Sequence, residues 1–255
     1  MRTLLLKELR ELLLPALLAF GAMVLLALAD VHTNRYRPQD LGTSLWFYAV
    51  LSIALALFGG ANAIARESRE QQVFLLCWPL SRRAIWAIKV AVSAGLLAAV
   101  AGLGYWCCVA IIGPQARQML LDELAGPVGA DMIELDFIVM VAVAYSLGLM
   151  WSGLVRSAHM TVGLAGLTAA VLSCGDALAL RWVSQRVPPA ERSSLALSLA
   201  ICLAAAALLA AWAAHVRLPL LETRKRLWVC LAVLLALTVL SVSGVAVAAA
   251  IRWRP

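Results

Sequence analysis

Side chains that could carry out acid–base, nucleophilic or metal chemistry are few and scattered in this sequence. His32, His159 and His215 are far apart in the 255 residues, and no C-x-x-C pair is present. Catalysis by a metal or by general acids and bases requires several such groups in one pocket. Cysteines inside apolar runs are usually small buried hydrophobic residues. The sequence therefore predicts no catalytic residue, no metal site and no disulfide among Cys77, Cys107, Cys108, Cys174, Cys202 and Cys230.

One polar segment, residues 66–89, lies between two long apolar runs and reads R-E-S-R-E-Q-Q-V-F-L-L-C-W-P-L-S-R-R-A-I-W-A-I-K. Its first part predicts a charged turn, formed by Glu67, Arg69 and Glu70. An apolar helical face of about two turns follows, made of Val73, Phe74, Leu76 and Cys77. A short amphipathic helix between two apolar segments suits insertion into a groove of a soluble partner.

The second part of this segment predicts the start of another helix. Pro79 ends the short amphipathic helix because proline cannot continue the backbone hydrogen bonds. Ser81 is the predicted N-cap of the next helix, which enters the bilayer through Arg82, Arg83 and Lys89.

Composition places these elements in a membrane. Hydrophobic residues make up 64% of the chain and charged residues 14%, and the mean hydropathy is +0.91. A soluble domain of this length could not bury so much apolar surface, so lipid must solvate the excess. The net charge of +7 comes from short basic clusters between apolar runs, which is typical of loops facing anionic lipid rather than of nucleic-acid binding.

The apolar runs predict an all-α, polytopic helix bundle forming a single transmembrane domain over residues 1–255. Six to seven helices would cross the membrane. Either the last span is an addition to the other six, or one of the short apolar runs does not cross. The predicted spans are residues 14–29, 43–65, 89–113, 137–155, 158–176, 194–214 and 228–250.

The first 13 residues predict an amphipathic helix on the membrane surface, with Leu5, Lys7, Leu9, Arg10 and Leu12 as its main residues. An alternative is a cleaved signal peptide ending at Ala27-Leu28-Ala29. Glu8 and Glu11 count against it, because acidic residues are uncommon in the positively charged start of a signal.

Loop charges predict a cytoplasmic N-terminus. With that orientation the inner segments hold 13 Lys and Arg against 5 Glu, and the outer segments hold 8 basic and 9 acidic residues. Eight of the nine tryptophans lie at the span ends expected of an aromatic belt: three at the outer ends, and Trp78, Trp86, Trp151, Trp212 and Trp228 at the inner ends. Trp106 alone lies well within a predicted span.

The predicted spans carry no ionisable residue near their middles, which disfavours an ion-coupled transporter. Small residues at four-residue spacing instead predict close helix packing, through Ala91, Gly95 and Ala99 in one span and Gly148 and Ser152 in the next.

The polar segment resembles the permease subunit of ABC-2 type ABC transporters. In that family a charged stretch after the second span precedes a Leu-Leu pair, a Pro-hydrophobic-Ser-Arg step and a Lys at the start of the third span. This chain has Glu67, Arg69, Leu75-Leu76, Pro79-Leu80-Ser81-Arg82 and Lys89 at those positions. The N-terminal L-L-K-E-L-R-E-L-L resembles the surface elbow helix of the family, so the resemblance covers mainly residues 1–110. Gln71-Gln72 stands where family members often have Gly-Thr.

The resemblance implies a multi-pass exporter subunit in the plasma (inner) membrane of a prokaryote. ATP and Mg would bind to a separate ABC ATP-binding subunit, whose closure the cytoplasmic coupling loop, residues 66–88, would transmit to the spans. A second permease copy, identical or different, would complete the path. The chain has no G-x-x-x-x-G-K-[ST] loop, so it is not expected to be an enzyme or to bind a cofactor itself.

Two other functions stay open. One is a non-transporting membrane scaffold or sensor with the same fold. The other is a membrane-embedded enzyme that modifies lipids, which would need polar groups such as His32, Asp122 and Glu123 to converge at the outer side. The sequence determines neither the transported substrate nor the direction of transport.

Overall fold

The computed structural model describes residues 2–33, 43–65, 81–113, 130–153, 155, 159–170 and 189–216, with six residues between Lys225 and Val239. Every element in these ranges is a helix, which confirms the predicted all-α class for this part of the chain. The helices are α1 (Arg2–Thr33), α2 (Thr43–Ala65), α4 (Arg82–Ile112), α6 (Ala130–Ser152) and α8 (Pro189–Val216), together with the helical segment 159–170.

The helices follow the predicted spans, with different ends. α2 has the same bounds as the predicted span 43–65, whereas α4 begins seven residues before the predicted span 89–113. Two described helices are long and apolar enough to cross a membrane, Leu9–Thr33 and Arg83–Ile112. Phe47–Ala63, Phe137–Ser152 and Ala200–Ala214 are shorter apolar helices. The total of six to seven crossing helices therefore stays a prediction.

α1 is one continuous helix through Pro15, whereas the sequence predicts an interfacial helix over 1–13 followed by a span over 14–29. Proline removes one backbone hydrogen bond, but packing against neighbouring helices allows a membrane helix to continue through it. Leu12 and Ala16, on either side of the proline, are both buried against the bundle. The two predicted elements are thus parts of one helix, and the position of residues 1–13 at a membrane surface stays a prediction.

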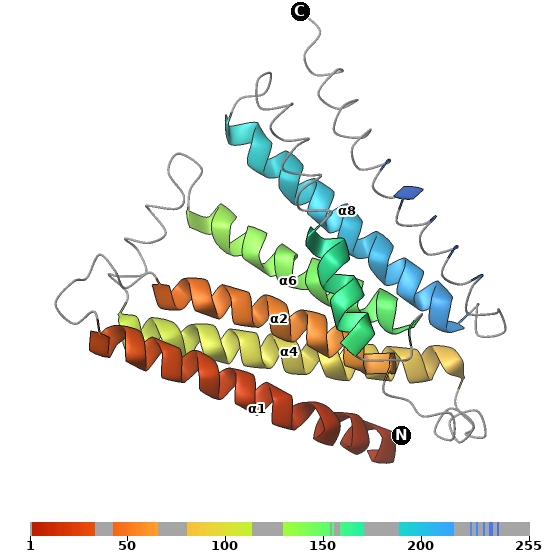
Figure 1. Ribbon diagram of the computed structural model, residues 1–255, viewed down its shortest axis with the longest axis horizontal. Coiled ribbons are helices and arrows are strands. Elements are labelled where there is room, and N and C mark those ends of the chain that lie inside the picture. Colours follow the sequence, from red (N-terminus) through yellow and green to blue (C-terminus); the bar gives the residue numbers. More distant parts are fainter. Residues whose placement is uncertain are drawn as a thin grey trace, which may run out of the picture.

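α2 and α6 lie side by side in the middle part of the bundle (Figure 1). α6 packs between α2 and α8, while α1 lies along α4, and α2 contacts both α1 and α4. Two hydrogen bonds show that α2 and α4 run antiparallel, because Tyr48 bonds to Ala101 and Lys89 bonds to Ala63. The bundle end that carries the C-terminus of α2 and the N-terminus of α4 is called the Lys89 end below.

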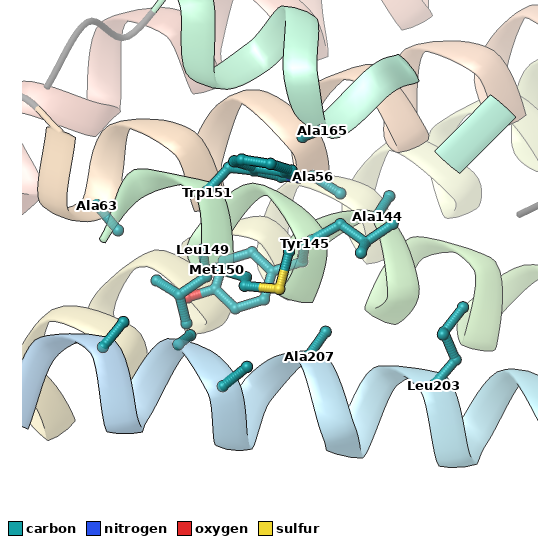
Figure 2. Close-up of a cluster of buried hydrophobic side chains, with 14 of the residues drawn as sticks. Ala56, Ala63, Ala144, Tyr145, Leu149, Met150, Trp151, Ala165, Leu203 and Ala207 are labelled. Carbon is teal, nitrogen blue, oxygen red and sulfur yellow. The ribbon is translucent and has the colours of Figure 1, made fainter. Parts of the chain in front are cut away.

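The main core surrounds the second half of α6. Every residue from Ala144 to Ser152 is buried, so this part of α6 is enclosed on all sides. Figure 2 shows Tyr145, Leu149 and Met150 on α6 with Ala207 and Leu203 of α8 on one side and Ala165 on the other. A smaller core at the opposite end of the bundle contains Met23, Ala27, Tyr48 and Cys108.

The outward faces of the helices are strongly apolar. α1 alone exposes eight leucines, and exposed large apolar residues also occur on α2, α4, α6 and α8. Examples with more than half of the side chain exposed are Leu6, Leu18, Leu25, Val50, Leu103, Trp106, Ile138, Met160 and Leu209. Soluble monomers rarely expose a continuous apolar surface of this kind.

Candidate functional site

The predicted coupling loop joins α2 to α4 at the Lys89 end of the bundle. α2 ends at Ala65 and α4 begins at Arg82, so the structure describes both helix ends that flank the loop. Most of the predicted coupling residues lie outside the described residues: Glu67, Arg69, Glu70, Val73, Phe74, Leu75, Leu76 and Pro79. The site can therefore be built from Ser81, Lys89 and the helices around them.

Ser81 is the N-cap of α4, as the sequence predicts. Its backbone is extended, with φ −65° and ψ 147°, and its Oγ accepts a hydrogen bond from the Ala84 amide at 3.2 Å. The first four amides of a helix have no partner inside the helix, and a serine at this position satisfies one of them. The cap therefore sets where the connection from α2 ends and where α4 begins.

Lys89 lies inside the bundle rather than at its edge. Only 3% of the residue is exposed, and its Nζ donates a hydrogen bond to the Ala63 carbonyl oxygen at 3.2 Å. Ala63 lies in the last turn of α2, where carbonyl groups lack helical partners and the helix dipole is negative. The ammonium of α4 thus stabilises the C-terminus of α2. The sequence predicts Lys89 at the entrance to the bilayer, but not this burial.

One turn further along α4, Ser93 and Tyr145 connect α4 to α6. The Ser93 hydroxyl and the Tyr145 hydroxyl are 2.6 Å apart. Ser93 Oγ also lies 2.8 Å from the Lys89 carbonyl oxygen, and Tyr145 OH lies 3.2 Å from that of Val90. Ser93 and Tyr145 are both buried, so this hydrogen bonding takes place away from water, where it is stronger.

Sequence reasoning missed Tyr145, and it left open whether Ser93 faces a transported molecule or serves helix packing. Ser93 follows Lys89 by four residues, which places both on neighbouring positions of one helix face. That spacing was a usable signal for a polar face on α4. No comparable signal exists for Tyr145, because it is more than 50 residues away in the sequence.

α2 and α6 approach each other most closely at Gly60 and Gly148. A Cβ atom on either glycine would collide with the backbone of the opposite helix, including the carbonyl oxygen of Tyr145. The predicted packing role of Gly148 and Ser152 is confirmed, since Ser152 is also buried. The same prediction is wrong for Ala91, Gly95 and Ala99 within this chain, because all three are exposed and Gly95 has no neighbour within 4 Å of an added Cβ.

Two tryptophans predicted for the inner aromatic belt differ in their burial. Trp151 is only 3% exposed, and its Nε1 donates a hydrogen bond to Thr168 Oγ1 at 3.0 Å. Its assignment to the belt is therefore wrong, because the ring belongs to the core. Trp86 is half-buried, and its Nε1 is buried without a hydrogen-bond partner within the described ranges.

The predicted elbow residues divide between two faces of α1. Leu9 and Arg10 are exposed, whereas Leu12 is buried against the bundle. Leu5 and Lys7 lie in the same helix, but their side chains are outside the described ones. α1 therefore presents Leu9 and Arg10 outward.

Aromatic rings gather at the end of the bundle opposite to Lys89. Tyr48 of α2 lies 5.9 Å from Tyr105 of α4 and 5.4 Å from Phe137 of α6, measured between ring centroids. The Tyr48 hydroxyl donates to the Ala101 carbonyl oxygen at 2.8 Å. This cluster fastens α2, α4 and α6 at their other end, and the sequence does not predict it.

The described residues do not assemble groups of the kind that the enzyme alternative needs. Within them, no three His, Cys, Asp or Glu side chains are close enough to hold a metal ion. His32 and His159 are both exposed, in α1 and in segment 159–170. Asp122 and Glu123 lie outside the described residues.

Comparison of the chain with protein-family models, with curated proteins and with solved structures finds no match in any of the three.

Proposed function

We propose that this chain is the membrane-spanning permease subunit of an ATP-driven ABC transporter of the ABC-2 type, acting as an exporter. It would work with a separate ATPase subunit and with a second permease copy. The segment between α2 and α4 would receive the movement of the ATPase and pass it to the helices. The sequence resemblance over residues 1–110 is the starting point of this proposal.

The apolar exterior supports the membrane part of the proposal. Leu18 on α1 and Leu103 on α4 are 67% and 59% exposed, within the two helices that are long enough to cross a membrane. Exposing such side chains to water would cost about 25 cal/mol for each Å² of apolar surface. A lipid bilayer removes that cost, because its hydrocarbon core is as apolar as leucine.

The single observation that carries the coupling role is the way Lys89 joins the two helix ends that flank the segment 66–80. Ser81 caps the start of α4, and Lys89 reaches back to Ala63 in the last turn of α2. A force on the connecting segment would therefore act on both helices at once. Buried ionisable residues in membrane helices are rare and are commonly functional. The burial of Lys89 therefore supports a functional role for it.

The experiment is purification of the tagged chain from its native host in mild detergent, followed by measurement of ATP turnover. We expect a soluble ATPase to co-purify and the complex to hydrolyse ATP in a vanadate-sensitive reaction. Phe74→Asp and Leu76→Asp should remove the ATPase, because each places a carboxylate in the predicted apolar docking face.

Leu120→Asp is the matched control, since it introduces the same charge in the segment predicted to lie on the outer side. It should leave the ATPase bound. The proposal is wrong if no ATP turnover accompanies the purified chain, or if all three substitutions have the same effect on ATPase binding.

A further inference from the structure

At the Lys89 end of the bundle, α4 and α6 are joined by side chains. The described helices whose backbones pack along one another include the pairs α2 with α6 and α2 with α4, but not α4 with α6. Tyr145 bridges this separation, because its hydroxyl lies 2.6 Å from Ser93 Oγ and 3.2 Å from the Val90 carbonyl oxygen. Val90 and Trp86 of α4 pack against the same apolar cluster as Tyr145.

The three residues Lys89, Ser93 and Tyr145 form one connected set. Ser93 Oγ lies 2.8 Å from the carbonyl oxygen of Lys89, and the side chain of Lys89 in turn donates to Ala63 of α2. The exposed fraction is 3% for Lys89 and for Ser93 and 6% for Tyr145. Breaking such buried contacts leaves polar groups without partners, which costs more than the same change at the surface.

We propose that Tyr145 is a positioning residue that makes the ends of α2, α4 and α6 move as one unit, through Ser93 to α4 and through Lys89 to α2. We call these three residues the polar junction. The transmission step rests on the proposed function, because it needs an ATPase that pushes on the segment 66–80. The physical link between the helices does not depend on that function.

The polar junction adds to the close contact of Gly60 with Gly148. Those glycines hold α2 against α6 by shape alone, whereas Tyr145 brings α4 into the same unit by a directional contact. Without Tyr145, a movement that entered at Arg82 would reach α6 only indirectly, through helices such as α2 that contact both.

A double-mutant cycle on the full chain in lipid nanodiscs tests the link. Tyr145→Phe and Ser93→Ala should each lower the folded-to-unfolded ratio about fivefold, the factor that corresponds to ~1 kcal/mol for one net hydrogen bond. The effects should be less than additive, because both substitutions remove the contact between the two hydroxyls, while each also removes a separate bond to a carbonyl of α4. Additive effects of the two substitutions would overturn the polar junction.

Two control substitutions match these changes. Ser146→Ala removes a buried serine that bonds only to Ala142 of its own helix among the described contacts, at 2.7 Å. Tyr48→Phe removes a phenol that bonds to Ala101 at the opposite end of the bundle. Ser146→Ala should be additive with Ser93→Ala, and Tyr48→Phe should be additive with Tyr145→Phe. Ser146→Ala is not combined with Tyr145→Phe, because the two residues are neighbours in the chain.

Hydrogen–deuterium exchange with and without vanadate trapping of the associated ATPase tests the transmission. In the unsubstituted protein, trapping should change exchange in peptides from both 82–93 and 144–152. In Tyr145→Phe the change in 82–93 should remain and the change in 144–152 should become smaller, because only the indirect route through α2 is left. Tyr48→Phe also removes a buried hydrogen bond, but it should keep both changes in exchange. A loss of stability alone would therefore not explain the response expected of Tyr145→Phe.

The failures can be told apart. An unaltered response of 144–152 in Tyr145→Phe would overturn the transmission and leave the proposed function standing. If no ATPase associates with the chain, the proposed function fails and the transmission step fails with it. The double-mutant cycle still decides whether the polar junction exists.

Discussion

Gly60 of α2 and Gly148 of α6 face each other where the two helices cross, with backbone against backbone. A Cβ atom added to Gly148 would lie 2.5 Å from the Leu57 carbonyl oxygen and 3.0 Å from the Ala61 amide nitrogen. One added to Gly60 would lie 2.8 Å from the Leu149 amide nitrogen. These neighbours are backbone atoms and cannot turn away as a flexible side chain could. The crossing therefore requires glycine on both helices.

The first prediction concerns this crossing. Gly60→Ala should destabilise the chain by about 1–3 kcal/mol, because overpacking forces the helices apart. Gly59→Ala is the control one residue away, where an added Cβ meets nothing within 4 Å. It should be neutral or stabilising by up to ~1 kcal/mol, since alanine favours a helix more than glycine does. Unfolding of both variants in detergent measures the difference, and equal stabilities would contradict the crossing.

The second prediction compares two tryptophans. Trp151→Phe removes a buried donor that bonds to Thr168, whereas Trp86→Phe removes a buried donor without a partner in the described structure. The first change should cost at least ~1 kcal/mol more than the second, because only the first breaks a hydrogen bond. The free energies of unfolding in the same detergent give the comparison. A larger cost for Trp86→Phe would show that its indole N–H has a partner.

The third prediction tests the helix cap at Ser81. Ser81→Ala should weaken the first turn of α4 by about 1 kcal/mol, while Ser81→Asp should retain it, because aspartate is also a good N-cap and its charge suits the helix dipole. Hydrogen exchange in a peptide covering 81–86 reports on this turn. Faster exchange is expected for the alanine variant alone. Equal exchange in all three proteins would mean that the cap does not hold the turn.

The fourth prediction separates a membrane helix from a soluble one. Leu18 and Leu6 of α1 are 67% and 65% exposed, so arginine at either position would be equally harmless in water. Within a bilayer, Leu18→Arg should cost about 2.5–3.5 kcal/mol of insertion free energy. Leu6→Arg should cost much less, because a guanidinium near the helix end reaches the headgroups. An insertion assay in microsomes with glycosylation tags measures both, and equal insertion would contradict a membrane-spanning α1.

Local features of the fold were predictable from the sequence. Ser81 was identifiable as the N-cap because a cap depends on residues within one turn of each other. The bounds of α2 were predicted because a charge-free run ends where the polar segment begins. The start of α4 was predicted by the same cap, although the predicted membrane span 89–113 begins seven residues later than the helix.

Faces and contacts were less predictable. Gly95 and Gly148 both lie at four-residue spacing from another small residue, yet of these two only Gly148 meets another helix among the described residues. Trp151 has the position of a belt residue and lies in the core. Spacing indicates which residues share a face, but it does not indicate which neighbour, if any, covers that face.

The sequence by itself determined the helical class, the approximate order of the helices and the cap of α4, because helix formation and capping depend on contacts within about four residues. The tertiary structure alone decided that Gly60 faces Gly148, that Lys89 reaches α2 and that Tyr145 reaches α4. The physical reason is the composition of the helices. Apolar residues occur on all faces of these helices and the polar face of α4 at Lys89 and Ser93 is short, so packing against helices distant in sequence sets the rotation about the helix axis.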